Sequence, residues 1–251
     1  MSKSNHPYEN FRFFQKTFQK FYNGVNNLFD GLAYHSAGAS HLLTNKAYQR
    51  FEMESDDLSD DSVYYGLSTY FDNTVIPHKI AVFKAGFNLW NLLPERVKQF
   101  DGGLKWAQIE GQLIEHDLSK FCYHERNGYL FHNFKSKEFD PSFEAAWNHH
   151  QKNNLHHPEY WISVNKNGTI FALEMPMNYV FEMVADWIGA GETYGNPLEP
   201  WLFGNLWKFL FHPKTAEKLL LILNEIIQGY TFEIAQSSMG VNIIMKELSN
   251  D

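Results

Sequence analysis

The chain has 251 residues, one cysteine and a formal net charge of −8, from 21 basic and 29 acidic residues. This length supports a hydrophobic core without disulfides or metal ions as staples, and the acidic balance argues against general binding to nucleic-acid backbones. The N-terminus lacks the apolar core of a signal peptide, and no aliphatic run approaches the length of a membrane span. We therefore expect a cytoplasmic protein.

The first part of the chain is predicted to be a helical extension. Apolar residues recur at steps of three and four across residues 8–29, which is typical of an amphipathic helix. The acidic stretch at 54–61 has almost nothing to bury and predicts a solvated linker. We place a boundary after it, so that an extension of residues 1–61 precedes a main domain of residues 62–251.

The main domain is predicted to be all-α with one small β-hairpin insertion. Helical apolar periodicity and breaking residues predict helices over 77–90, 104–121, 142–151, 177–188 and 216–227. Two β-leaning runs separated by Asn165-Lys-Asn-Gly168 predict a hairpin at 162–173. Alternation at 230–234 is compatible with a terminal strand.

Histidine is the most informative residue type in this sequence. Seven of the 12 histidines fall between 116 and 157, whereas phosphate-binding glycine loops and the G-x-S-x-G nucleophile motif are missing. His116 and Asp117 are neighbours on the predicted helix 104–121, about 100° apart, so both can reach one metal ion. Lys120 shares their helix face and provides a cation for an anionic substrate.

Further candidate ligands flank this pair in the sequence. His78 begins the predicted helix 77–90, and two doublets bracket a turn downstream: His149, His150, His156 and His157. His124 and His132 are expected at the surface.

An acidic pair lies on the later apolar helix. Asp186 sits between apolar positions and would be costly to bury without a cation; the alternative is a solvent-facing residue opposite the apolar stripe. Glu182 lies one turn earlier.

The order of these residues resembles the metal-site order of the HD-domain superfamily of metal-dependent phosphohydrolases. The stretches His116-Asp-Leu-Ser-Lys120, Trp147-Asn-His-His-Gln-Lys-Asn-Asn-Leu-His-His-Pro-Glu-Tyr-Trp161 and Glu182-Met-Val-Ala-Asp-Trp187 are similar to an uncharacterised HD-related family found in bacteria, phages and large viruses. The resemblance covers about residues 75–228.

The resemblance implies an HD-like helical bundle with a first metal on four side chains: His78, His116, Asp117 and Asp186. It also implies that Asp117 bridges to a second metal if the downstream histidines bind one. Which of His149 or His150, and which of His156 or His157, points inward stays open. The cofactor is then one or two divalent ions: manganese, iron, cobalt, nickel, zinc or magnesium.

The leading functional hypothesis is hydrolysis of a phosphomonoester or phosphodiester in a small substrate, including nucleotides, by metal-activated water. Lys120, Asp117 and Glu182 are the candidate catalytic residues. Lys120 stabilises charge, while Glu182 orients a ligand or accepts a proton, unless it is a plain surface residue. The alternatives are an HD-type di-iron oxygenase and a non-catalytic module that binds a partner through aromatic segments such as 201–211. The sequence is also compatible with a homo-oligomer.

Overall fold

The computed structural model describes residues 70–135 and 140–248. The predicted helix at 8–29, the acidic linker at 54–61 and the boundary that follows it lie outside the described residues.

Helices make up most of the described part of the chain, as predicted. In chain order they are α4 (Ile76–Leu92), α5 (Glu95–Lys98), α6 (Trp106–Glu115), α7 (Tyr123–Lys135), α8 (Pro141–Asn153), α9 (Met177–Tyr194), α10 (Leu198–Asn205) and α11 (Pro213–Ile226). Short turns extend or join them: η1 (Phe71–Val75), η2 (Phe100–Gly102), η3 (Leu118–Phe121), η4 (Pro158–Trp161) and η5 (Leu206–Lys208). None of these described helices combines the length and hydrophobicity of a membrane crossing.

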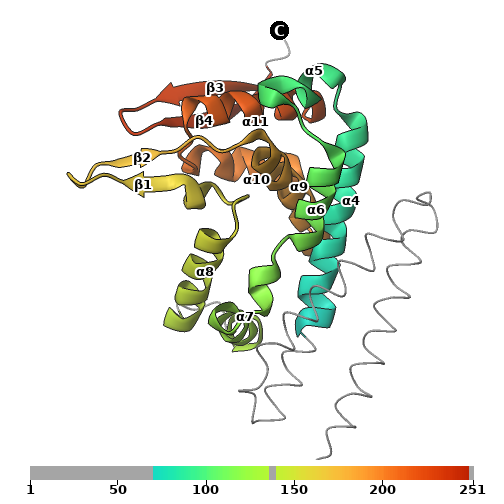
Figure 1. Cartoon of the computed structure of the whole chain (residues 1–251), viewed down its shortest axis with the longest axis vertical. Helices are drawn as coiled ribbons and strands as arrows, with labels where there is room; N and C mark the ends of the chain where they lie inside the picture. The colour runs from blue at the N-terminus through green and yellow to red at the C-terminus, as the bar shows by residue number, and fades with distance from the viewer. Residues whose placement is uncertain (1–69, 136–139, 249–251) are drawn as a thin grey trace, which may run out of the picture.

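Helices α4 and α9 pack together at the centre of the fold, with α6 beside α4 (Figure 1). The two central helices run antiparallel, because ring contacts join Trp90 to Phe181 at one end and His78 to Tyr194 at the other. A Cβ atom on Gly189 would lie 2.6 Å from the backbone nitrogen of Val82. Glycine at this position therefore lets the two helices approach closely.

Helices α7 and α8 pack against each other at the lower end of the molecule in Figure 1. A Cβ atom on Gly128 would lie 2.5 Å from the carbonyl oxygen of Ser142, so this pair is also tightly packed. Helix α8 begins with Asp140 as its N-cap, whose side chain accepts a hydrogen bond from the backbone nitrogen of Ser142.

Two antiparallel hairpins complete the described fold. Strands β1 (Ile162–Val164) and β2 (Ile170–Ala172) form the predicted hairpin, and Gly168 adopts a φ of 80° in its turn. Strands β3 (Tyr230–Gln236) and β4 (Val241–Glu247) form a second hairpin. The all-α prediction with one hairpin is therefore corrected to a mainly helical fold with two small sheets.

Most of the predicted helices agree with the structure. Helices α4, α8, α9 and α11 correspond to the predictions at 77–90, 142–151, 177–188 and 216–227, while α5, α7 and α10 were not predicted. The prediction of one helix over 104–121 is wrong, because α6 ends at Glu115 and a separate turn follows at Leu118–Phe121.

The aromatic segment 201–211 contributes to the core. Leu202, Leu206 and Phe211 are buried, whereas Phe203 and Trp207 are about half exposed. Binding of a partner through this segment stays a prediction.

Candidate metal centre

The two central helices bring together the first and last candidate ligands. His78 lies near the start of α4 and Asp186 lies in the middle of α9. Nε2 of His78 is 3.1 Å from Oδ1 of Asp186. The side chain of Asp186 is only 14% exposed, so it faces the protein interior and not the solvent.

A bend in the chain directs His116 and Asp117 toward the same place. Asp117 adopts the left-handed conformation, with φ 56° and ψ 23°, directly after α6 ends. The fully buried Lys79 donates hydrogen bonds from Nζ to the carbonyl oxygens of Ile114 and His116. These bonds satisfy carbonyl groups that the end of α6 leaves without helical partners.

The prediction that His116, Asp117 and Lys120 share one helix face is therefore wrong, although the side chains still meet. Lys120 lies on the short turn η3, and its Nζ is 2.7 Å from Oδ2 of Asp117. The contact arises from the left-handed bend and the tight turn after it, and not from helical periodicity.

The four side chains that the resemblance implies as ligands of a first metal lie close together, and we call them the first ligand group. Nε2 of His78 lies 3.4 Å from Oδ2 of Asp117 and 3.1 Å from Oδ1 of Asp186. Nε2 of His116 lies 3.5 Å from Oδ2 of Asp117 and 3.3 Å from Oδ1 of Asp186. The two Nε2 atoms are 3.4 Å apart. Ligands about 2.1 Å from a tetrahedral cation lie about 3.4 Å apart. The potential ligand atoms of His78, His116 and Asp117 all lie within 4.8 Å of one another, so their spacing fits ligands around one divalent ion, and Oδ1 of Asp186 lies next to both histidines.

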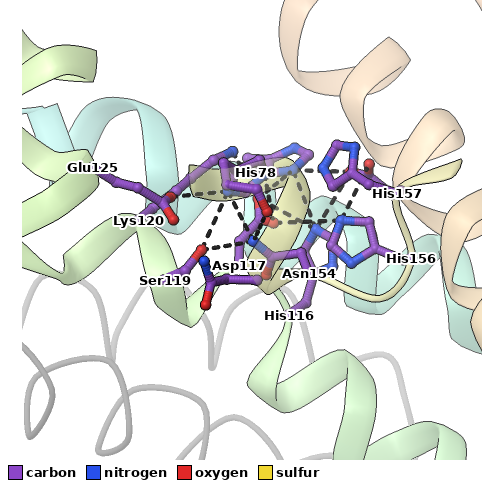
Figure 2. A network of polar contacts seen from close by, with 12 residues as sticks. His78, His116, Asp117, Ser119, Lys120, Glu125, Asn154, His156 and His157 are labelled. Carbon is purple, nitrogen blue, oxygen red and sulfur yellow. Dashed lines mark hydrogen bonds and ion pairs between the residues drawn. The ribbon is translucent and has the colours of Figure 1, made fainter. Parts of the chain in front are cut away.

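A second group forms on the other oxygen of Asp117. Oδ1 of Asp117 is 3.4 Å from Nε2 of His150 and 3.5 Å from Nε2 of His156, and His157 completes a cluster whose potential ligand atoms all lie within 4.8 Å of one another. Figure 2 shows Asp117 close to His78 and His116 of the first group and to His156 and His157 of the second. His150 lies in the last turn of α8, and the other two histidines follow in the turn before η4.

Three buried atoms of the second group lack hydrogen-bond partners in the described structure: Oδ1 of Asp117, Nε2 of His156 and Nε2 of His157. Leaving buried polar atoms without a partner is costly. Because these three atoms converge on the same space, their chemistry fits a cation that would satisfy all three.

Glu182 lies behind the imidazoles of both groups. Its Oε1 is 3.1 Å from Nδ1 of His116 and 3.2 Å from Nδ1 of His156, so each ring directs its Nε2 toward the centre. Gln112 donates to Oε2 of Glu182, and Asn178 donates to Gln112. Carboxylates behind metal-binding histidines fix the orientation and tautomer of the ring.

Glu125 orients the ring of His150 in the same way, and the sequence did not lead us to predict this residue. The carboxylate is fully buried on α7, with Oε2 2.9 Å from Nδ1 of His150 and Oε1 2.7 Å from Nδ1 of His149. Ser119 and Asn154 also contact Nδ1 of His150.

The structure separates the candidate histidines that the sequence left open. In the first doublet His150 reaches Asp117, whereas His149 turns to Glu125, stacks on the exposed His124 and belongs to a separate group with Cys122. In the second doublet both His156 and His157 belong to the cluster with Asp117.

His132 is only partly exposed and stacks on Phe143, away from both ligand groups. The expectation of a surface position thus holds for His124 but only in part for His132.

The charges of the centre are strongly coupled. Burial by itself lowers the pKa of His116, but the carboxylates of Asp117 and Asp186 outweigh burial and raise this pKa to about 9. Burial raises the pKa values of both aspartates, yet the neighbouring imidazoles hold them well below the usual range. Burial lowers the pKa of His150 to about 4 and also lowers that of His156.

The shifts of both aspartates, His150 and His156 match what a metal centre requires, because metal ions bind neutral imidazoles and ionised carboxylates. The buried His150 and His156 favour the neutral ring at pH 7. The raised pKa of His116 instead favours the protonated ring, which would lose its proton on binding a metal ion.

Lys120 adds a positive charge beside the centre. Burial lowers its pKa, but the carboxylate of Asp117 outweighs burial and holds the pKa well above its usual value. Its ammonium group also lies 5.6 Å from the ring centroid of Tyr129. Lys120 is therefore a permanent cation within contact of the shared aspartate.

Comparison with known proteins identifies a family but no described activity. A model of a family of unknown function (DUF5662) matches residues 67–228, which is about two thirds of the chain and includes every side chain of both ligand groups. The second hairpin, β3–β4, lies beyond the matched region. No curated protein and no solved structure gives a significant match. By the extent of this match, the chain belongs to the DUF5662 family of unknown function.

Proposed function

We propose that this protein is an HD-type metal-dependent phosphohydrolase with two adjacent divalent ions. The observation that carries the proposal is the position of Asp117, whose two oxygens face separate ligand groups. Two ions that share a ligand form the usual arrangement for hydrolysis of phosphate esters. The order His78, His116-Asp117 and Asp186 supports the HD-type assignment by its resemblance to that superfamily.

The first ion would be held by His78, His116, Asp117 and Asp186. The second would be held by Asp117 together with the three histidines of the downstream turn: His150, His156 and His157. Divalent ions at such a centre supply a water molecule with a lowered pKa and neutralise negative charge on a phosphoryl group.

The chain's own groups orient and balance this centre. Glu182 and Glu125 hold the Nδ1 atoms of three ligand histidines, which keeps each Nε2 directed inward. Lys120 places its ammonium group beside Asp117, where it can stabilise charge that develops on the phosphoryl oxygens. Glu182 therefore acts as a positioning residue in this proposal, and the alternative role as a proton acceptor is not needed.

The test uses the full chain loaded separately with manganese, iron, cobalt, nickel, zinc or magnesium. We expect about two ions per chain by elemental analysis and cleavage of phosphomonoesters or phosphodiesters in a substrate panel. His116→Ala should abolish turnover and lower the metal content, whereas His124→Ala should change neither, because His124 is exposed and outside both groups. Absence of turnover with all six metals would contradict the proposal.

The second ligand group also favours an alternative reaction. Three imidazoles and one carboxylate form a donor set that suits iron. An HD-type di-iron oxygenase would retain iron through purification in air and consume dioxygen when given an organic substrate. Protein that hydrolyses phosphate esters with redox-inactive zinc or magnesium would exclude this alternative as the main activity.

A further inference from the structure

A cavity of about 230 Å³ adjoins the candidate metal centre. It is bordered by Asp186 of the first ligand group and His157 of the second, so a molecule in the cavity would touch both groups. Five large aromatic side chains are among the residues that line it: Trp147, Trp187, Tyr194, Trp201 and Phe209.

Three of these aromatic residues form one continuous surface. The ring of Trp187 on α9 lies 5.4 Å from that of Trp201 on α10 and 5.8 Å from that of Phe209, measured between centroids. The rings of Trp201 and Phe209 are 6.2 Å apart. Because these rings already support one another, they form a preformed surface on which a planar group can stack.

A fourth ring connects the cavity to the ligand histidines. Trp147 on α8 lies edge to face with His157 at 5.5 Å and stacks on His150 at 5.7 Å. The same tryptophan therefore borders the cavity and supports two imidazoles of the second group.

The charged side chains around the cavity are acidic. Glu159 and Asp186 border it, and none of the described residues that line it is lysine or arginine. Apart from the ions of the proposed centre, a negatively charged group inside this cavity would meet no cationic lysine or arginine among the described residues that line it, and it would lie beside the carboxylate of Glu159.

We propose that the cavity binds the organic group of the substrate, and that this group is a compact aromatic ring system without negative charge. This inference rests on the proposed function and specifies its substrate class. A cavity of about 150 Å³ accommodates benzene, so the volume here suits a group of one or two rings. The substrate is then the phosphate monoester of an aromatic alcohol, and not a polyphosphate or a nucleic acid.

The hydrolysis that follows from this arrangement is balanced. Water attacks phosphorus, the bond between phosphorus and the ester oxygen breaks, and the aromatic alcohol leaves with one proton of the water. Inorganic phosphate is the second product. The aromatic walls hold the leaving alcohol, while the ligand groups and Lys120 surround the phosphoryl group.

Binding of two phosphonates tests the inference without any turnover. We expect the manganese-loaded full chain to bind phenylphosphonate at least about tenfold more tightly than methylphosphonate in calorimetric titrations, because only the former has a ring to bury. Trp201→Ala should reduce this ratio to below about threefold, and Ala190→Leu, which fills the cavity, should do the same. Trp207→Ala should retain the ratio, since Trp207 is 54% exposed and does not line the cavity.

Binding of phenol tests the cavity in the absence of metal. It should quench tryptophan fluorescence of the metal-free wild type, and Ala190→Leu should weaken that binding at least about tenfold, because its larger side chain occupies the cavity. Equal affinities for the two phosphonates, or tighter binding of methylenediphosphonate than of phenylphosphonate, would overturn the inference. A clear preference for phenylphosphonate without hydrolysis of phenyl phosphate would support the cavity's role and count against the proposed function.

Discussion

Replacement of Glu182 by glutamine tests how the imidazoles are positioned, because it leaves every proposed metal ligand in place. In the structure Oε1 of Glu182 contacts Nδ1 of His116 at 3.1 Å and Nδ1 of His156 at 3.2 Å, while Oε2 accepts from Gln112 at 3.2 Å. The variant keeps the size of the side chain and one acceptor oxygen. Its amide nitrogen, however, would face the amide nitrogen of Gln112, whose oxygen is already engaged by Asn178. At least one hydrogen bond of this network must then be lost.

The expected effect follows from the position of this carboxylate. Loss of the partner behind a metal-binding histidine typically lowers metal affinity about 10- to 100-fold, which corresponds to about 1.4–2.8 kcal/mol. Glu182 serves one imidazole in each ligand group. We therefore expect Glu182→Gln to weaken the binding of both ions by this amount, and not of one ion alone.

Competition with a chelator measures the two dissociation constants for manganese in the wild type and the variant. Glu192→Gln is the matched control, because Glu192 lies on the same helix, is half exposed and pairs with Lys84 at the surface. A thermal melt of the metal-free proteins checks that both variants fold. Dissociation constants of Glu182→Gln within twofold of the wild type for both ions would refute the positioning role.

The helical framework of the site could be predicted because the spacing of apolar residues indicates which face of each helix is buried. On α9 the residues predicted to point inward, Val180, Val184 and Trp187, are buried. The bend at Asp117 could not be predicted in this way, because it depends on Lys79, 37 residues before His116 in the chain. The sequence between 104 and 121 contains a continuous apolar pattern and no glycine or proline near the bend.

The direction of each histidine in the doublets also depends on distant residues. Adjacent histidines have almost the same sequence context, and both contact Glu125 on a different helix. Only His150 also places its Nε2 near Asp117, which the sequence does not indicate. One indication was present in the sequence. Tyr129 and Leu130 are buried on α7, Cys122 is buried just before the helix, and Glu125 lies at helical spacing from these residues. A buried carboxylate on an apolar stripe requires a partner, and here the partners are histidines.

Two further predictions concern the framework and the charge of the centre. Gly189→Ala should lower the free energy of unfolding by about 1–3 kcal/mol in urea denaturation, because the new methyl group meets the backbone of Val82. The control is Gly111→Ala on α6, where the added Cβ meets open space. This substitution should instead stabilise the protein by up to about 1 kcal/mol. A smaller loss for Gly189→Ala than about 0.5 kcal/mol would contradict the close packing of α4 and α9. Metal binding should also release a proton from His116. Because the pKa of His116 in the metal-free protein is about 9, it is protonated at pH 7 and must lose its proton to coordinate through Nε2. Apparent manganese affinity, measured by chelator competition, should therefore rise about tenfold per pH unit from pH 7 to about 9 and level off above it. An affinity that stays constant between pH 7 and 9 would show that His116 is neutral before the metal binds.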